Sequence, residues 1–280
     1  MHMKRLVAML LVLLMMPLAM AEETAKYRVE EMPVEKDDGN VVAGWLYVPE
    51  GDGPFPTLVL CHGFNGTHQN MTGYAEYFAQ RGYLCYVFDF CGGGVDSQST
   101  GATEDMTLLT ELDDLDNVVS LVSCLDEADP ERFVIAGASQ GGLLTALYTA
   151  RNPELVRAAI LLYPALMAPD NARTNYPEAS EIPETVTFMH MTVGRGYYEV
   201  MREINAWAEI AAFDKPVLLL HGTADQIVPH SVSEQALTVY PNAQLVSIPD
   251  AGHGFYLADR QTACETMEAF LADVMQASAE

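Results

Sequence analysis

The residues of this chain with the clearest chemical meaning are the five from Gly137 to Gly141, which read Gly-Ala-Ser-Gln-Gly. They stand between an apolar run at 132–136, typical of a buried strand, and a helix-forming run at 143–150. This pattern predicts a sharp strand–turn–helix junction with Ser139 at its apex. Such a turn exposes the Ser139 hydroxyl as a nucleophile and places the main-chain N–H of Gln140 beside it as an oxyanion donor. Because the motif also occurs by chance in ordinary glycine-rich turns, the partners of the serine decide its meaning.

A serine hydroxyl becomes a nucleophile when a histidine takes its proton, and the histidine needs a carboxylate to orient it. The apolar run at 216–220 predicts a buried parallel strand, and Asp225 lies in the loop that follows it. A further short strand is predicted at 245–248, and the next loop carries His253. Catalytic groups gather at the carboxyl ends of the strands in such sheets, so we predict that Asp225 is the acid and His253 the base for Ser139.

The other histidines fit structural roles better. His62 follows the predicted strand at 57–60 and starts a His-Gly turn, in which the N–H of Phe64 is the predicted second oxyanion donor. His221 and His230 flank the Asp225 loop and could compete for its carboxylate, but neither lies beyond the last strand, where the base is expected. His68 and His190 have no companion at metal-ligand spacing, and the sequence predicts no metal site.

Apolar, β-rich runs alternate with amphipathic segments along the chain. Strands are predicted at 41–48, 57–60, 83–88, 133–136, 158–162, 217–220 and 245–248. Helices are predicted at 73–80, 106–127, 140–151, 231–239 and 261–275. This alternation predicts an α/β fold with a mostly parallel central sheet and helices on both faces.

The first 21 residues have a basic start, an apolar core and an Ala-x-Ala end. They predict a secretory signal peptide cut before Glu22, which would leave 22–280 as one domain in the periplasm or outside the cell, without stable membrane insertion. The net charge of −25 argues against nucleic acid and other anionic partners. The five cysteines are an odd number without Cys-x-x-Cys spacing, so at least one thiol is free.

These motifs resemble the α/β-hydrolase family over nearly all of the chain after the signal peptide. The resemblance lies in His62-Gly63, 137–142, 221–225 and 252–255, and in the order Ser, Asp, His. Within the family, the chain looks like the bacterial cinnamoyl and feruloyl esterases, through Phe88-Asp89-Phe90, the elbow at 139–142 and a lid-sized insert. Those esterases usually carry Gly-His-Gly after the Phe-Asp-Phe strand, where this chain has Cys-Gly-Gly-Gly at 91–94. The resemblance implies a serine esterase without a cofactor, acting on small-molecule or polysaccharide-linked hydroxycinnamate esters, such as feruloyl groups.

About fifty residues, 165–215, separate two strands that one helix and short loops would join, so an inserted cap is expected there. Within it, 185–193 alternates like a strand and 194–196 reads as a turn. The segment is rich in aromatic residues and methionine, which would suit a flat aromatic acyl group or, alternatively, simply pack the cap on the body. The residues predicted to bind substrate are Asp170, Tyr176, Tyr198 and Trp207. Asp170 is also the alternative acid if Asp225 does not serve.

Three other functions remain open at this stage. A serine exopeptidase of the same fold could use Glu178, Glu181 and Glu184 to capture a free amino terminus, although the chain is shorter than peptidase relatives with an extra domain. A generic short-chain acyl esterase or lipase would need the same catalytic residues. A non-catalytic binding module on a hydrolase scaffold is the third, because fold does not imply function. The sequence leaves the oligomeric state open, a dimer included.

Overall fold

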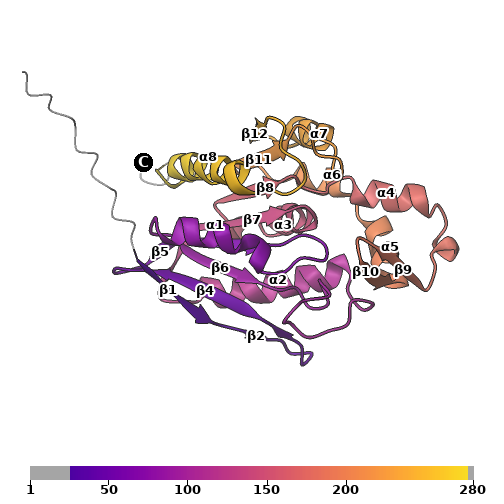
Figure 1. Cartoon of the computed structure of the whole chain (residues 1–280), viewed down its shortest axis with the longest axis horizontal. Helices are drawn as coiled ribbons and strands as arrows, with labels where there is room; N and C mark the ends of the chain where they lie inside the picture. The colour runs from indigo at the N-terminus through magenta and orange to yellow at the C-terminus, as the bar shows by residue number, and fades with distance from the viewer. Residues whose placement is uncertain (1–25, 277–280) are drawn as a thin grey trace, which may run out of the picture.

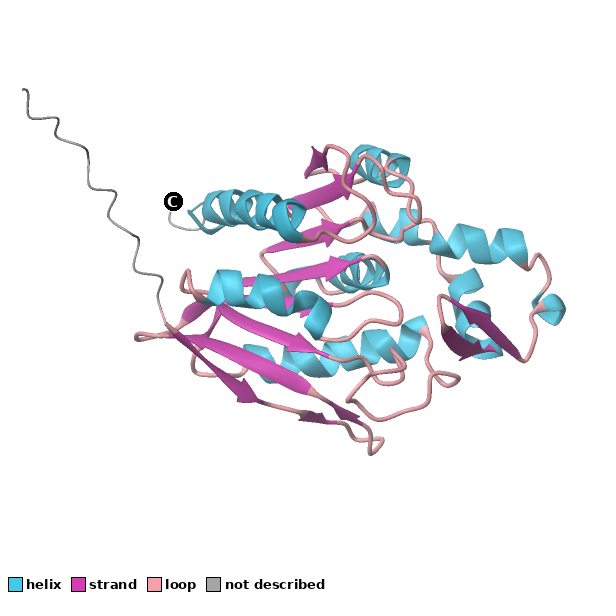
Figure 2. Cartoon of the chain, viewed as in Figure 1, coloured by secondary structure: helices cyan, strands magenta, loops and turns pink. Residues whose placement is uncertain are grey.

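The computed structural model describes residues 26–276, so the predicted signal peptide, 1–21, lies outside the described residues. Its core is an eight-stranded sheet with the order β1-β4-β6-β5-β7-β8-β11-β12 (Figures 1 and 2). The strands are β1 (Tyr27–Glu31), β4 (Gly44–Pro49), β5 (Phe55–Cys61), β6 (Leu84–Phe88), β7 (Ala128–Ala138), β8 (Ala158–Leu162), β11 (Val217–Gly222) and β12 (Ala243–Ile248). Only the pairings of β4, with β1 and with β6, are antiparallel in this sheet. The predicted fold class is confirmed.

Helices cover both faces of the sheet because its central strands are apolar on both sides. On one face, residues such as Val59 pack with α2 (Leu108–Ser123), α3 (Gln140–Arg151) and α7 (Ser231–Val239). On the other face, residues such as Leu58 pack with α1 (Gln69–Ala79) and α8 (Leu257–Gln276). Helix α2 starts at a capping box in which Thr107 and Thr110 satisfy each other's main-chain N–H. The smaller elements of the body are β2 (Val34–Glu35), β3 (Val41–Val42) and the 3₁₀ turn η1 (Pro153–Leu155).

The segment between β8 and β11, residues 163–216, is called the cap segment here. It contains α4 (Ala168–Asn175), η2 (Ala179–Glu181), β9 (Thr185–Phe188), β10 (Met191–Gly194), α5 (Arg195–Glu203) and α6 (Ala206–Ile210). Figure 1 shows α4, α5, β9 and β10 together, beyond the carboxyl ends of the parallel strands. The cap segment therefore lies on the side of the sheet where the site residues were expected.

One local prediction in the cap segment is wrong. The stretch 185–193 is a hairpin of β9 and β10 rather than one strand, because the chain reverses at Met189 and His190. Both residues have positive φ, 45° and 64°, as a two-residue hairpin turn requires, yet neither is a type that usually signals such a turn. The predicted turn at 194–196 is instead the end of β10 and the start of α5.

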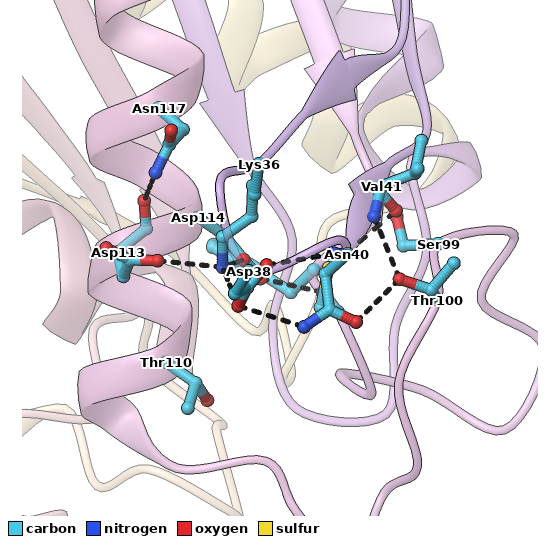
Figure 3. A network of polar contacts seen from close by, with 12 residues as sticks. Lys36, Asp38, Asn40, Val41, Ser99, Thr100, Thr110, Asp113, Asp114 and Asn117 are labelled. Atoms are coloured by element: carbon cyan, nitrogen blue, oxygen red, sulfur yellow. Dashed lines mark hydrogen bonds and ion pairs between the residues drawn. The ribbon is translucent and has the colours of Figure 1, made fainter.

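An ionic network around the buried side chains of Lys36 and Asp114 links the β2–β3 hairpin to the body (Figure 3). The Lys36 ammonium contacts Asp114 at 2.6 Å and Asp113 at 2.8 Å, both on α2. Burial works against the charged ammonium, but its bonds to the two carboxylates outweigh burial and raise the pKa of Lys36 above its ordinary value. The second oxygen of Asp114 accepts the N–H of Cys91 at 2.7 Å. The network therefore also holds the start of the Cys-Gly-Gly-Gly loop, residues 91–94.

All five cysteines are free thiols, and all but Cys124 are buried. Burial raises the pKa of the Cys61 thiol to about 12, so this residue is no nucleophile near neutral pH. Among the described residues, no helix is long and apolar enough to cross a membrane.

Candidate active site

Ser139 lies at the junction of β7, which ends at Ala138, and α3, which begins at Gln140. Its φ of 56° and ψ of −117° lie in a region that non-glycine residues rarely adopt. Such strain at a functional turn is typical of a nucleophile elbow, because it lifts the side chain away from the sheet. The local structure at Ser139 is therefore the one that the glycine-flanked motif predicts.

The structure brings together the three residues predicted to act with one another. His253 Nε2 lies 3.0 Å from Ser139 Oγ, and His253 Nδ1 lies 2.8 Å from Asp225 Oδ2. The other carboxylate oxygen of Asp225 accepts the main-chain N–H groups of Ile227 at 2.8 Å and Val228 at 3.0 Å. With Nδ1–H donated to Asp225, Nε2 of a neutral His253 is the acceptor that a serine proton needs.

His221 and His230 have other partners. The buried ring of His221 contacts Ser233 Oγ at 2.7 Å and the carbonyl oxygen of Val228 at 2.9 Å. Its Nε2 also lies 3.3 Å from Asp225 Oδ2, farther than His253 Nδ1. Burial lowers the pKa of His221 and so favours its neutral form, and its bonds to Ser233 and Val228 tie it to the loop. His230 contacts Ser247 Oγ at 2.7 Å.

The main-chain N–H groups of Phe64 and Gln140 border the same space as Ser139. Gln140 is the first residue of α3, whose first N–H groups have no partner within the helix. Phe64 belongs to the turn after β5, which His62 shapes: its Nδ1–H donates to the carbonyl oxygen of Gly63, and its Nε2 accepts the N–H of Phe90. Among the described residues, neither the Phe64 nor the Gln140 N–H has a hydrogen-bond acceptor. Both N–H groups are therefore available to an oxyanion.

Two cavities meet at Ser139. The larger, called the cap cavity, has a volume of about 350 Å³, and the smaller, called the mouth cavity, about 180 Å³. Phe64, Ser139 and Met189 line both cavities, whereas Gln140 lines only the cap cavity and His253 only the mouth cavity. The middle of a bound molecule that fills both cavities would therefore lie beside Ser139.

The cap cavity has an aromatic and methionine-rich wall. The ring of Phe64 is stacked on Phe188 of β9 at 4.1 Å between centroids. Tyr197 and Tyr198, both on α5, meet edge to face at 5.1 Å. The remaining lining residues of this cavity include Met167, Ala168, Asn171, Ala172, Asn175 and Met201. Such a wall suits a flat aromatic group.

Three of the four predicted substrate-binding residues do not line this cavity. Tyr198 lines it, and Tyr176 packs edge-on against Tyr198 at 4.9 Å, outside the lining. The prediction that Asp170 and Trp207 bind substrate is corrected, because these two side chains contact each other: Trp207 Nε1 donates to Asp170 Oδ2 at 2.8 Å. Asp170 also pairs with Arg173. The reason is helical spacing, since α4 turns the face with residues 168, 171, 172 and 175 toward the cavity and Asp170 lies off that face. Asp170 thus has partners other than the base.

A buried polar chain behind the nucleophile escaped the sequence analysis. Glu111 Oε2 accepts a hydrogen bond from Gln140 Nε2 at 2.7 Å, and the Tyr197 hydroxyl donates to Gln140 Oε1 at 2.6 Å. All three side chains are buried. The available signal was one carboxylate among the apolar positions of an amphipathic helix, which does not identify a partner. Burial raises the pKa of the Glu111 carboxyl well above its ordinary value of 4.5.

Replacing Glu111 with glutamine is expected to make the stability of the protein less sensitive to pH. Above pH 4.5 the unfolded chain releases a proton that the folded protein keeps on Glu111, as the raised pKa requires. The free energy of unfolding then falls by about 1.4 kcal/mol per pH unit until the folded pKa is passed. The charge of Asp114, on the same helix, raises the pKa of Glu111 further, whereas the hydrogen bond from Gln140 lowers it.

Urea unfolding of the wild type and Glu111→Gln between pH 4.5 and 8 measures this difference directly. The free energy of unfolding of the wild type minus that of Glu111→Gln should decrease as pH rises. Glu131→Gln, which replaces an exposed carboxylate, is the matched control and should follow the wild type. A constant difference between Glu111→Gln and the wild type across this range would mean that Glu111 is ionised in the folded protein.

The strained serine turn, the mostly parallel sheet and the two N–H groups define an α/β-hydrolase fold enzyme of the serine hydrolase class. The chain belongs to the prolyl oligopeptidase family, whose model matches residues 69–278. The predicted α/β-hydrolase resemblance is confirmed, and so is the class of enzyme, a serine hydrolase of esterase type.

Relatives and solved structures agree with this classification. The uncharacterized protein YfhR of Escherichia coli K12 is 26% identical over 242 residues, covering 84% of this chain and 76% of YfhR. A putative carboxymethylenebutenolidase of Escherichia coli O157:H7 is 26% identical over 250 residues, covering 79% of this chain and 80% of that protein. Est1E from Butyrivibrio proteoclasticus, solved with ferulic acid bound, has a TM-score of 0.80 and 28% identity, covering 88% of this chain and 99% of Est1E.

Proposed function

We propose that this protein is an exported serine carboxylesterase that hydrolyses hydroxycinnamate esters, such as feruloyl esters. The observation that carries the proposal is the junction of the two cavities at Ser139, with an aromatic cavity on one side and His253 on the other. In this proposal Ser139 is the nucleophile, His253 the base and Asp225 the acid that orients it. The N–H groups of Phe64 and Gln140 form the oxyanion hole.

The mechanism follows from these contacts. Ser139 Oγ attacks the ester carbonyl while His253 Nε2 takes its proton, and Asp225 stabilises the imidazolium that forms. The carbonyl oxygen becomes an oxyanion, which the N–H groups of Phe64 and Gln140 stabilise. When the tetrahedral intermediate collapses, His253 gives the proton to the departing alcohol. Water then attacks the acyl-enzyme by the same route and releases the acid.

The position of His253 supports a placement of the two halves of the ester in the two cavities. Because His253 must reach the leaving oxygen, the alcohol belongs in the mouth cavity, which His253 lines. The acyl group then belongs in the cap cavity, beyond the oxyanion donors. The aromatic wall of the cap cavity supports a hydroxycinnamoyl group, as does the likeness to Est1E, which was solved with ferulic acid bound.

The mouth cavity supports a polar alcohol such as a sugar. Its lining includes Asn70 and Tyr256, and the Tyr256 side chain is mostly exposed, at 67%. An exposed aromatic face beside amide and hydroxyl groups suits a ring that carries hydroxyl groups on its edge and C–H groups on its face. Export is part of the proposal because of the sequence pattern at 1–21, and a polysaccharide substrate outside the cell would agree with it.

Peptidase activity is the second candidate, because the family is that of prolyl oligopeptidase. Capture of a free amino terminus would need a carboxylate that reaches the mouth or cap cavity. Glu181 instead accepts the N–H of Glu178 at 3.0 Å, and Glu184 pairs with Arg195 at 3.1 Å. None of the predicted glutamates at 178, 181 and 184 lines either cavity, which favours the esterase.

Replacing Ala168 with phenylalanine is expected to block bulky acyl groups selectively. Ala168 lines the cap cavity from α4, and a phenyl ring there would occupy the space of a hydroxycinnamoyl group. The kcat/KM for methyl ferulate should fall by about 10–100-fold, while that for 4-nitrophenyl acetate should change by less than about threefold. Steady-state kinetics on the two esters measures the effect.

The matched control for this experiment is Ala179→Phe, which places the same ring on an exposed part of the cap segment. Ala179 lies outside the lining of both cavities, so its replacement should spare both esters. Equal losses on the two esters in a folded Ala168→Phe protein would contradict the acyl assignment. Wild-type hydrolysis of aminoacyl anilides in preference to both esters would favour the peptidase instead.

A further inference from the structure

Both residues of the proposed oxyanion hole are in contact with the cap segment. Gln140 receives a hydrogen bond from Tyr197 of α5 through its side-chain oxygen, at 2.6 Å. Phe64 is stacked on Phe188 of β9 at 4.1 Å and lies 5.8 Å from the ring of Tyr197. The cap segment thus contacts the two residues whose N–H groups stabilise the transition state, not only the acyl cavity.

The Gln140 side chain is held at both ends of its amide. Its Nε2 donates to Glu111 on α2, and its Oε1 accepts from Tyr197, so one residue of α3 joins two other helices. These atoms are shut off from water, since Glu111 is 1% exposed and Gln140 and Tyr197 are 4% exposed. Leaving a buried polar group without its partner costs about 1–3 kcal/mol, so the arrangement resists rotation of the Gln140 side chain.

The ring and the hydroxyl of Tyr197 make different contacts, so their contributions can be tested separately. The ring packs near Phe64 beside the cap cavity, which Tyr197 lines, whereas the buried hydroxyl donates to the Gln140 amide. An acyl group that packs against the ring therefore also packs against the anchor of Gln140. Removal of the hydroxyl alone would leave the wall in place and release the anchor.

We propose that Tyr197 is a positioning residue which, through the side chains of Gln140 and Glu111, fixes the oxyanion N–H of Gln140 and couples it to the cap segment. The proposal rests on the proposed oxyanion role of Gln140. Its consequence is that the cap segment contributes to the turnover of every ester, including small ones that do not enter the cap cavity. A cap that only selects the acyl group would affect bulky esters alone.

Tyr197→Phe tests the proposal with 4-nitrophenyl acetate, whose acetyl group is too small to fill the cap cavity. We expect kcat to fall by about 10-fold or more, with KM changed by less than about twofold. Complete loss of an oxyanion donor costs about 10²–10³ in kcat, and a displaced donor should cost less. A loss confined to the KM for methyl ferulate would overturn the proposal, because it would make Tyr197 only part of the cavity wall.

Tyr148→Phe is the matched control for lost stability. Tyr148 is a buried tyrosine of α3, and its hydroxyl contacts Asp116 of α2 at 2.9 Å, so the variant also loses one bond between helices. It should lower the melting temperature about as much as Tyr197→Phe but leave kcat for 4-nitrophenyl acetate unchanged. Equal kcat losses in the two variants would mean that general loosening, not positioning, lowers the activity, and would overturn the proposal.

Two replacements of Glu111 test the far end of the chain of contacts. Glu111→Gln keeps an oxygen that can accept a hydrogen bond from Gln140 Nε2, whereas Glu111→Leu does not. The kcat of Glu111→Gln should therefore be clearly higher than that of Glu111→Leu. Adding Glu111→Leu to Tyr197→Phe should cost less than the sum of the two single effects, because the three side chains act as one unit. Full additivity would contradict the coupling.

These outcomes separate the proposal from the proposed function. A wild type that hydrolyses 4-nitrophenyl acetate but not methyl ferulate would contradict the feruloyl substrate and leave the test of Tyr197 intact. If the wild type hydrolyses neither ester, the rate of inactivation by a fluorophosphonate replaces kcat as the readout, because serine displaces fluoride from phosphorus while the phosphoryl oxygen occupies the oxyanion position. An unchanged inactivation rate in Tyr197→Phe would then overturn the proposal.

Discussion

Alanine at Ser139 or at His253 is expected to lower kcat for ester hydrolysis by a factor on the order of 10⁵–10⁶. Either change removes the proton transfer, because His253 Nε2 and Ser139 Oγ, 3.0 Å apart, act as one unit. The double variant should therefore be little worse than either single variant. Steady-state kinetics on 4-nitrophenyl acetate, with active sites counted by a fluorophosphonate on the wild type, measures the loss.

Alanine at Asp225 should cost less, roughly 10⁴ in kcat, because His253 remains as a base without its orienting partner. Asp170→Ala is the control, since Asp170 contacts Arg173 and Trp207 and should leave the reaction intact. Near-full activity of Asp225→Ala would show that the acid is another residue. Loss of activity in Asp170→Ala together with retention in Asp225→Ala would identify Asp170 as that acid.

The arrangement of Ser139, Asp225 and His253 was predictable because short-range signals and topology both act on it. The glycine-flanked turn is encoded in five consecutive residues, and each of the other two side chains follows an apolar strand of a parallel sheet. Parallel strands place their carboxyl ends at one edge, so residues 86 and 28 positions apart in the sequence meet there. No long-range contact had to be guessed.

The interior of the cap segment was less predictable because its structure depends on tertiary packing rather than on the hydrophobic periodicity of the sequence. The hairpin turn at Met189 and His190 lacks glycine and asparagine, the residues that usually mark positive φ. Composition alone suggested Asp170 and Trp207 as contacts, whereas the face of α4 that reaches the cavity is set by how the helix docks. Strand β1 was missed because its side chains are mostly exposed or half-buried and show no clear alternation.

The contacts of Glu111 show a second limit. An amphipathic helix pattern predicts which residues are buried, but a buried carboxylate looks the same whether it meets an ammonium, as Asp114 does, or an amide, as Glu111 does. The two positions are three residues apart on one face of α2, and their partners come from different parts of the chain. Only the tertiary structure identifies those partners, and with them the link between α5 and Gln140.

Helix α3 approaches the main chain at the end of β5 closely at Gly141, within the proposed site. A Cβ atom added to Gly141 would lie 2.2 Å from the carbonyl oxygen of His62 and 2.6 Å from that of Cys61. Both atoms belong to main chain that cannot rotate away, so a side chain at 141 must push the helix and the Phe64 turn apart. The proposed oxyanion donors belong to the two segments that meet here, Gln140 to α3 and Phe64 to the turn after β5.

Gly141→Ala is therefore expected to lower kcat by about 10²–10³, since a displacement of about 1 Å at a reacting site can cost 10²-fold. It should also destabilise the fold by about 1–3 kcal/mol through overpacking. Gly252→Ala, beside His253 but with no atom within 4 Å of the added Cβ, is the matched control and should retain activity within about threefold. Kinetics and thermal unfolding of the two variants measure both effects. A Gly141→Ala protein with wild-type kcat would mean that α3 and the Phe64 turn can separate without disturbing the oxyanion hole, which would argue against fixed N–H donors as the source of catalysis.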